Sequence, residues 1–325
     1  RPSARPTSSP SKACSNPGNC MNYLKDQMFA VSVRVGTPME TLDNRNSAHY
    51  KASQWILEEC DATTPIDLCS TSQMLLREQR YALSVLYFSL GGERWRRGSN
   101  PNLDRGWLSG SNYCIWSGVI CDAFGNVLQF SLEDNNMIGT IPHEIGIFDK
   151  LSHVSMDINQ ITSTIPEEFY LNHDLKEVYL FENSLSGTIS NRVGELSKLE
   201  AFEVENNNFV GTIPSAFGNC HNLEWLLLDE NNFSGPIPNT IRNLKNLKVL
   251  GLSHNYLAGT IPTLLEAIPN LLQLFLDGNN FNGAVPCRDH YHDDLDNEDY
   301  DLIADCYLQC HCCTDGCGGD YDDDA

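Results

Sequence analysis

Thirteen cysteines are the residues of this sequence with the widest choice of chemistry. Zinc could bind to the segment that holds Cys310, His311, Cys312, Cys313 and Cys317. That segment lacks the two CxxC pairs that are typical of a structural zinc site. Because the cysteines gather towards the two ends of the chain, disulfides formed in an oxidising compartment are the favoured interpretation. We therefore expect no bound metal and no other cofactor.

The number of cysteines is odd, so complete pairing leaves one of them free. The cysteines near the N-terminus allow two bridges, and those near the C-terminus allow three more. The simplest account pairs twelve cysteines and leaves Cys220 unpaired. The predicted disulfide residues are Cys14, Cys20, Cys60, Cys69, Cys114, Cys121, Cys287, Cys306, Cys310, Cys312, Cys313 and Cys317.

The sequence carries no specific catalytic signature. It contains no GxSxG, HExxH, GxxxxGK[ST] or protein-kinase motif. The acidic run at 293–299 fails the EF-hand pattern, because Asp299 stands where the turn glycine should be if Asp294 opens the loop. We predict that the chain is not an enzyme. The alternative is a glycosidase with a pair of catalytic carboxylates, which the number of carboxylates alone does not exclude.

The formal net charge of −22 argues against nucleic acid and against an anionic membrane surface as partners. No stretch approaches the roughly 20 apolar residues that span a bilayer. The chain opens on a polar run, which we interpret as a cut end with a signal peptide or membrane anchor removed upstream. Together with the cysteines, this predicts an extracellular protein, either secreted or the ectodomain of a membrane-anchored one.

An internal repeat of 24 residues organises the middle of the chain. Each repeat has two apolar residues at period two, then an asparagine, and four residues later a segment like GTIP. The apolar pair predicts a short strand with one buried face, and the asparagine amide can satisfy backbone groups of neighbouring coils. Ser163 and Ser190 replace the usual Gly and Pro, which predicts looser geometry there. The repeated asparagines are Asn135, Asn159, Asn183, Asn207, Asn231, Asn255 and Asn279.

One coil cannot bury its apolar side alone, so the coils must stack into one core. The pattern LxxLxLxxNxLxGxIP resembles the plant-type leucine-rich repeat, found in ectodomains of receptor-like kinases, receptor-like proteins and polygalacturonase inhibitors. The segment CIWSGVIC at 114–121 looks like that family's N-terminal cap, which implies a bridge between Cys114 and Cys121. The segment QRYALSVLYFSLGGERW and the CHCC of the tail are similar to algal, diatom-type members.

The resemblance covers about residues 72–287 and implies an α/β solenoid. This is a right-handed leucine-rich-repeat superhelix with one parallel sheet on its concave face, a helical N-terminal cap and a Cys-rich C-terminal cap. We expect a Pro/Ser-rich flexible stalk at 1–19, a disulfide-bonded helical cap region at 20–126, seven repeats at 127–286 and an acidic tail at 287–325. Helices are predicted at 47–59 and 72–90. They are interpreted as the cap, with a membrane-lying helix as the alternative.

The concave face is where we expect a ligand, because side chains between the buried strand residues point there and line up across coils. Carboxylates and exposed aromatic or apolar residues share these columns, and such residues often mark partner surfaces. The alternative is that the aromatics merely pack against one another along the sheet. The predicted ligand-binding residues are Tyr179, Phe181, Glu203, Glu205, Trp225, Leu227, Asp229, Phe275 and Asp277.

Three functions fit this surface: a receptor-type ectodomain, a cell-wall or matrix structural protein, and an enzyme inhibitor of the polygalacturonase-inhibitor type. We expect a peptide, glycan or protein ligand that is cationic or partly apolar. Asn232-Phe233-Ser234 is the one clear N-glycosylation sequon, so Asn232 is predicted to carry a glycan in secreted material.

Overall fold

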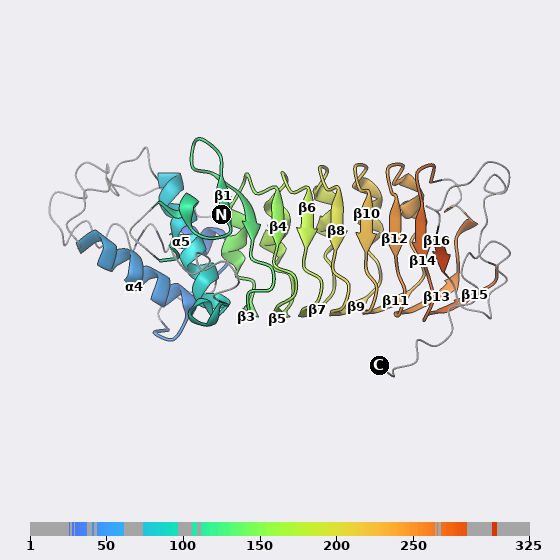
Figure 1. Ribbon diagram of the computed structural model, residues 1–325, viewed down its shortest axis with the longest axis horizontal. Coiled ribbons are helices and arrows are strands. Elements are labelled where there is room, and N and C mark those ends of the chain that lie inside the picture. The colour runs from blue at the N-terminus through green and yellow to red at the C-terminus, as the bar shows by residue number, and fades with distance from the viewer. Residues whose placement is uncertain are drawn as a thin grey trace.

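The computed structural model of the chain is an elongated solenoid whose strands lie side by side along its length (Figure 1). The structure describes residues 26, 28, 30–37, 41, 44–61, 74–96, 106–108, 112–263, 265, 268–284 and 301–303. The predicted stalk, most of the C-terminal tail and its cysteines lie outside the described residues. The acidic run at 293–299 and the CHCC segment lie outside them as well.

The concave face is a sheet of nine strands, one from each coil and one from each end. Its first pair, β1 and β2, is antiparallel, and every later pair is parallel with matching positions of successive coils in register. Each strand spans only three to five residues, as expected where two apolar residues alternate with exposed ones. In order, the strands are β1 (Val119–Cys121), β2 (Val127–Ser131), β4 (His153–Ser155), β6 (Glu177–Tyr179), β8 (Ala201–Glu203), β10 (Trp225–Leu227), β12 (Val249–Gly251), β14 (Gln273–Phe275) and β16 (Asp301–Ile303).

A second row of seven short strands runs along another side of the solenoid, which the sequence analysis did not anticipate. These strands follow the ladder asparagines and pair in parallel from coil to coil. Figure 1 shows them along the lower edge of the molecule. They are β3 (Ile138–Thr140), β5 (Gln160–Ser163), β7 (Ser184–Gly187), β9 (Asn208–Gly211), β11 (Asn232–Gly235), β13 (Tyr256–Thr260) and β15 (Asn280–Asn282).

The repeated asparagines form the hydrogen-bonded ladder that their spacing predicts. Asn207 is typical: its Nδ2 donates to the carbonyls of Leu180, Val204 and Glu205 at 3.0, 3.1 and 3.2 Å. Its Oδ1 accepts from the backbone N–H of Leu185 at 2.9 Å. One buried side chain therefore bonds four backbone groups from two coils, and it is the partner of the Leu185 N–H, while the three carbonyls also accept from Asn183, Asn231 and the N–H of Glu182. Asn183, Asn231, Asn255 and Asn279 repeat this arrangement.

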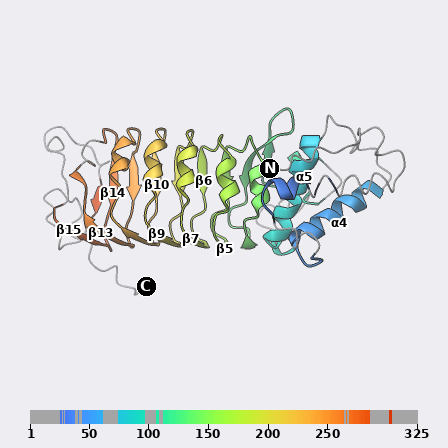
Figure 2. The ribbon, with the colours of Figure 1, turned by 180° about the vertical axis from the view of Figure 1, so that it is seen from behind.

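Short 3₁₀ turns close the coils on the side away from the concave sheet, and they are best seen from behind (Figure 2). Large apolar side chains from these turns and from the strands fill a continuous core, in which Phe130, Phe169, Phe202 and Phe217 are completely buried. The turns are η4 (His143–Ile147), η5 (Glu167–Leu171), η6 (Asn191–Glu195), η7 (Ser215–Asn219) and η8 (Asn239–Asn243).

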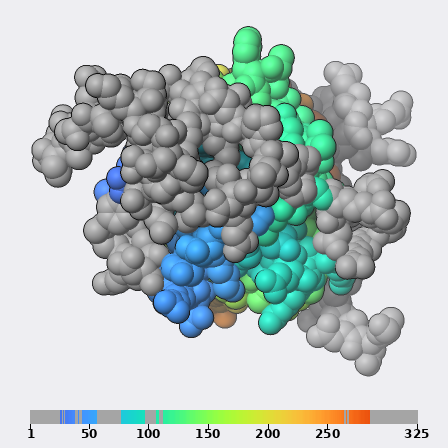
Figure 3. All heavy atoms as spheres, turned by 90° about the vertical axis from the view of Figure 1, so that its left-hand side faces the viewer, coloured from blue at the N-terminus to red at the C-terminus, as the bar shows by residue number. Residues whose placement is uncertain are grey.

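Two helices, α4 (Ala48–Asp61) and α5 (Met74–Ser89), cover the N-terminal end of the solenoid (Figure 3). Ile56, Leu83 and Leu86 are buried in the same core as the repeats. The carbonyl of Leu90, just after α5, accepts the N–H of Ile138 in the first coil at 3.1 Å. The cap prediction is therefore confirmed, and the burial of Ile56, Leu83 and Leu86 in the core favours it over the alternative of a membrane-lying helix. Within the described residues, no helix is long and apolar enough to cross a bilayer.

A buried carboxylate fastens the cap to the first coil. The side chain of Glu144 in η4 is completely buried and accepts from Thr37 Oγ1 at 2.7 Å and from Ser32 Oγ at 3.1 Å. The Nε2 of His49, from α4, lies 3.0 Å from the other carboxylate oxygen. Burial alone would raise the pKa of Glu144, but the hydrogen bonds and the His49 ring outweigh it and lower that pKa.

The two departures from the repeat pattern do not loosen the coils, contrary to the sequence prediction. Ser190 keeps an extended φ of −68°, close to the −60° of Pro214, and its Oγ accepts the N–H of Arg192. Ser163 keeps the left-handed conformation of the glycines that it replaces, with φ of 74° against 76° at Gly187 and 86° at Gly211. Local hydrogen bonding and the stacked neighbours hold both positions to the repeat geometry.

Ser163→Gly should therefore stabilise the protein by about 1 kcal/mol, because a residue with a Cβ costs roughly 1–2 kcal/mol in the left-handed region and glycine's extra entropy offsets only part of that. Thermal and urea unfolding measure the change. Ser186→Gly in the next coil is the matched control. Ser186 has no positive φ, so the same substitution there should be mildly destabilising. A Ser163→Gly protein no more stable than the wild type would contradict the strain argument.

Candidate ligand-binding face

The solvent side of the nine-stranded sheet carries the predicted binding residues in two columns. Register places Tyr179, Glu203 and Leu227 next to one another on β6, β8 and β10. The second column follows the strand ends, where Phe181, Glu205 and Asp229 recur at intervals of 24 residues and Asp277 follows two intervals later. Trp225 opens β10 at the other end of that strand and is 36% exposed. The other eight predicted residues are half-buried.

The four aromatics do not pack on one another. Among the described residues, ring pairs in the repeats lie in the core, such as Phe202 with Phe217 and Phe209 with Phe233. No such pair joins any two of Tyr179, Phe181, Trp225 and Phe275, so the alternative of an aromatic row along the sheet is not supported. None of the four rings is completely buried, so each has some surface that a ligand could contact.

Trp225 has a cation partner that the sequence analysis missed. The Nζ of Lys248, from the next coil, lies 5.0 Å from the centre of the Trp225 ring and 2.5 Å from Oε2 of Glu224. The two residues are 23 positions apart, nearly one full repeat, and this spacing is the only signal in the sequence that places them together. A cation on this indole is already part of the free protein, which shows that the ring accepts cationic groups.

Carboxylates crowd the middle of the face, and their ionisation is suppressed. Burial raises the pKa of Glu203 to about 7, and the charges of Asp157 and Glu177 add to the effect. Burial likewise raises the pKa of Glu205 to about 8 and that of Asp229 to about 6. The formal charge therefore overstates the negative field at acidic pH, and part of it develops only as the pH rises.

Ser253, which the prediction did not include, connects two of these carboxylates. Its backbone N–H donates to Asp229 Oδ1 at 2.7 Å, and its hydroxyl donates to Asp277. The Nε2 of His254 lies 3.4 Å from the other oxygen of Asp277. By contrast, Oε2 of Glu205 in the preceding coil is buried without a hydrogen-bond partner. Hydrogen bonds from the next coil or the same face thus hold Asp229 and Asp277, whereas one oxygen of Glu205 has no such bond.

Replacing Glu205 by Gln should stabilise the protein more as the pH rises. The pKa of Glu205 is raised, so the folded chain keeps a proton that the unfolded chain loses above about pH 4. The stability from this group is fully present below about pH 4 and is lost as the pH rises through about 8. Glutamine cannot ionise and avoids that loss.

Melting temperatures of wild type and Glu205→Gln at pH 5 and pH 8.5 measure this effect, and the advantage of the variant should be larger at pH 8.5. Glu182→Gln removes one exposed carboxylate from the preceding coil and controls for net charge. An advantage for Glu205→Gln that is equal at the two pH values would contradict a raised pKa.

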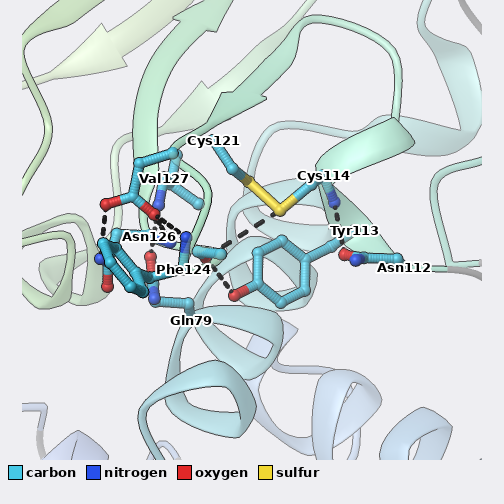
Figure 4. Close-up of a disulfide and its surroundings, with 10 residues drawn as sticks. Gln79, Asn112, Tyr113, Cys114, Cys121, Phe124, Asn126 and Val127 are labelled. Carbon is cyan, nitrogen blue, oxygen red and sulfur yellow. Dashed lines mark hydrogen bonds between the residues drawn. A yellow bond between two sulfur atoms is a disulfide. The ribbon is translucent and has the colours of Figure 1, made fainter.

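The one disulfide among the described residues joins Cys114 to Cys121 beside the first strand (Figure 4). Tyr113 Oη donates to the carbonyl of Gly125 at 2.6 Å, which ties the bridge to the following turn. Cys220 is a free, buried thiol. Of the other predicted disulfide cysteines, Cys60 lies in α4 and the rest fall outside the described residues. The described residues hold no group of three or more His, Cys, Asp or Glu side chains that could bind a metal ion.

Comparison with known proteins agrees with this architecture. The Leucine Rich Repeat family model matches residues 198–220, 222–244 and 246–268. Receptor-like kinase TMK4 of Arabidopsis thaliana is 38% identical over 76 residues, which are 23% of this chain and 8% of that protein. The chain thus spans less than a tenth of the length of this curated relative.

Solved structures show the same likeness. The complex of PEPR1 with AtPEP1 aligns with a TM-score of 0.60 and 28% identity over 65% of this chain and 29% of that one. The Arabidopsis receptor kinase HAESA, in complex with the peptide hormone IDA and the co-receptor SERK1, aligns with a TM-score of 0.55 and 30% identity over 65% and 35%. The repeats at 198–268 thus match leucine-rich repeats, and the solenoid is similar to those of these plant receptors.

Proposed function

We propose that the chain is the extracellular ligand-recognition part of a receptor-type protein, which binds a peptide or protein with its concave face and catalyses no reaction. The observation that supports this most is the concave face itself. Aromatic side chains that do not pair with one another and carboxylates held by hydrogen bonds stand on it, on strands that pair in register.

The solved relatives support the same class of partner. HAESA is bound to a peptide hormone and a co-receptor, and PEPR1 is in complex with AtPEP1. An extracellular location fits these relatives and the disulfide between Cys114 and Cys121, since such bridges persist in oxidising compartments. Asn232 begins β11 on the second row of strands, away from the concave face, so a glycan there would leave the proposed ligand site open.

The finer part of the proposal is that the ligand is cationic or partly apolar. The carboxylates of Asp229 and Asp277 favour a positive group, and Tyr179, Phe181 and Phe275 offer apolar surface beside them. Electrostatic attraction would speed the encounter, and the apolar contacts would hold the complex once it forms.

Cross-linking can test where a partner binds. The chain is used as bait in extracellular fluid of its source, and the captured protein or peptide is cross-linked to it and mapped by mass spectrometry. Cross-links should fall on residues around the concave sheet, such as Lys176 and Lys248. Cross-links confined to the 3₁₀ turns or to the second row of strands would contradict the proposal. They would instead favour a matrix or inhibitor role that uses those surfaces.

A further inference from the structure

Gly251 interrupts the first column of the concave face. The residues at this position in the other coils from 131 to 275 all carry side chains, namely Ser131, Ser155, Tyr179, Glu203, Leu227 and Phe275. Register sets Gly251 directly between Leu227 on β10 and Phe275 on β14. Two apolar side chains therefore flank a column position that has no side chain of its own.

The backbone does not explain this glycine. Glycines of the GTIP segments, such as Gly187 and Gly211, have positive φ angles, whereas Gly251 does not. What requires glycine is the side chain of Asp229. A Cβ at residue 251 would lie 2.8 Å from Cγ of Asp229, would overlap its Oδ2, and would come within 3.0 Å of Cδ2 of Leu227. The Asp229 carboxylate occupies the space that a side chain at 251 would fill.

The carboxylate is held there from the next coil. Its Oδ1 accepts the N–H of Ser253 at 2.7 Å, across one repeat. Asp157 is the residue at the same repeat position three coils before Asp229. Its carboxylate instead accepts from the hydroxyl of Ser155, in its own coil, at 2.8 Å. In that coil pair the column position is filled by Tyr179, which is aligned with Ser155. The hydrogen bond from the next coil to Asp229 thus occurs where the column residue is a glycine, without a side chain.

We infer that Gly251 is a positioning residue of the concave face: it lets the Asp229 carboxylate lie between Leu227 and Phe275, where it receives the cationic head of a lysine or arginine side chain from a peptide ligand. The inference rests on the proposed concave-face binding and names the chemistry of one subsite. Adjacent strands are about 4.8 Å apart, so Leu227 and Phe275 stand roughly 10 Å apart on either side of the carboxylate and can contact the alkyl stem of a side chain whose charged end meets it. Lysine and arginine combine such a stem with a positive end.

The first test needs no ligand. In Gly251→Ala the new methyl group should push the carboxylate out of its place, since an aspartate side chain moves more easily than the strand. The Ser253 amide should then exchange its proton with solvent faster, by roughly tenfold or more for a lost hydrogen bond. In an Asp229→Ala background the same Gly251→Ala change should leave Ser253 exchange unaltered. Hydrogen exchange followed by NMR reports both, and circular dichroism checks the fold.

The second test uses n-butylammonium as the probe, with n-butanol as the neutral control of the same shape. Butylammonium should shift the Ser253 amide resonance saturably in the wild type, and butanol should not. Gly251→Ala should weaken this binding at least fivefold, and Asp229→Asn should abolish it while keeping the side-chain shape.

Three outcomes would overturn the inference. They are unchanged Ser253 exchange in Gly251→Ala, equal shifts with butylammonium and butanol, and undiminished butylammonium binding by Gly251→Ala. None of these measurements involves the natural partner. Failure of the wider proposal, seen as cross-links away from the concave sheet, is therefore a separate result.

Discussion

Trp225→Ala and Phe181→Ala should each weaken binding of the natural partner by roughly 10- to 100-fold, mainly through faster dissociation. Both rings stand on the concave face without an aromatic partner, and truncating such an anchor typically costs about 1.4–2.7 kcal/mol. Neither ring is completely buried, so the fold should survive the change. Removing Trp225 also releases Lys248, which keeps its ion pair with Glu224.

Surface plasmon resonance with the captured partner measures both rate constants, and circular dichroism verifies folding. Tyr256→Ala is the matched control, because Tyr256 is a 61% exposed aromatic on the second row of strands. It should bind like the wild type. If Tyr256→Ala weakens binding and the concave-face variants do not, the ligand site lies on the lateral surface and the concave assignment is wrong.

The solenoid could be predicted from the sequence because each coil faces the same physical requirement. A strand of two buried residues, an asparagine that must satisfy buried backbone and a turn recur at one fixed interval, so a single interpretation explains seven copies. The Asn ladder and the cap helices are confirmed for the same reason, since their signals are local or periodic. The resemblance to plant-type repeats adds the concave placement of the sheet.

Other features depend on contacts that no local pattern encodes. Glu144 looks like an ordinary charged residue of a surface turn, and only the docking of the cap buries it. Residues just before the ladder asparagines adopt positive φ, including the β-branched Ile158 at 54°, although nothing in that sequence favours it. At the ligand face, the positions of Lys248 and Asp229 follow from the neighbouring coil. Repeat spacing shows which residues are neighbours but not which way their side chains turn.

Asn207→Ala should destabilise the solenoid by about 3 kcal/mol, the largest effect expected of a single polar substitution in the repeats. The change leaves the N–H of Leu185 without its acceptor and removes one of the two donors from each of three carbonyls, in a part of the core where Asn207 is only 7% exposed. The unsatisfied N–H costs about 1–3 kcal/mol and each lost carbonyl hydrogen bond about 0.5–1.5 kcal/mol, and partial relaxation or entry of water keeps the total below the sum of these terms. Asn208→Ala, one residue later, is the matched control, because Asn208 is exposed on β9 and should cost less than about 0.5 kcal/mol. Urea unfolding of both variants followed by circular dichroism measures the difference.

Because coils stack only on their neighbours, the loss of stability should also appear locally. The backbone amide of Leu185, whose N–H donates to the Asn207 side chain, should exchange its proton faster in Asn207→Ala. Equal stability of the two variants would show that the ladder amide contributes no more than a surface side chain.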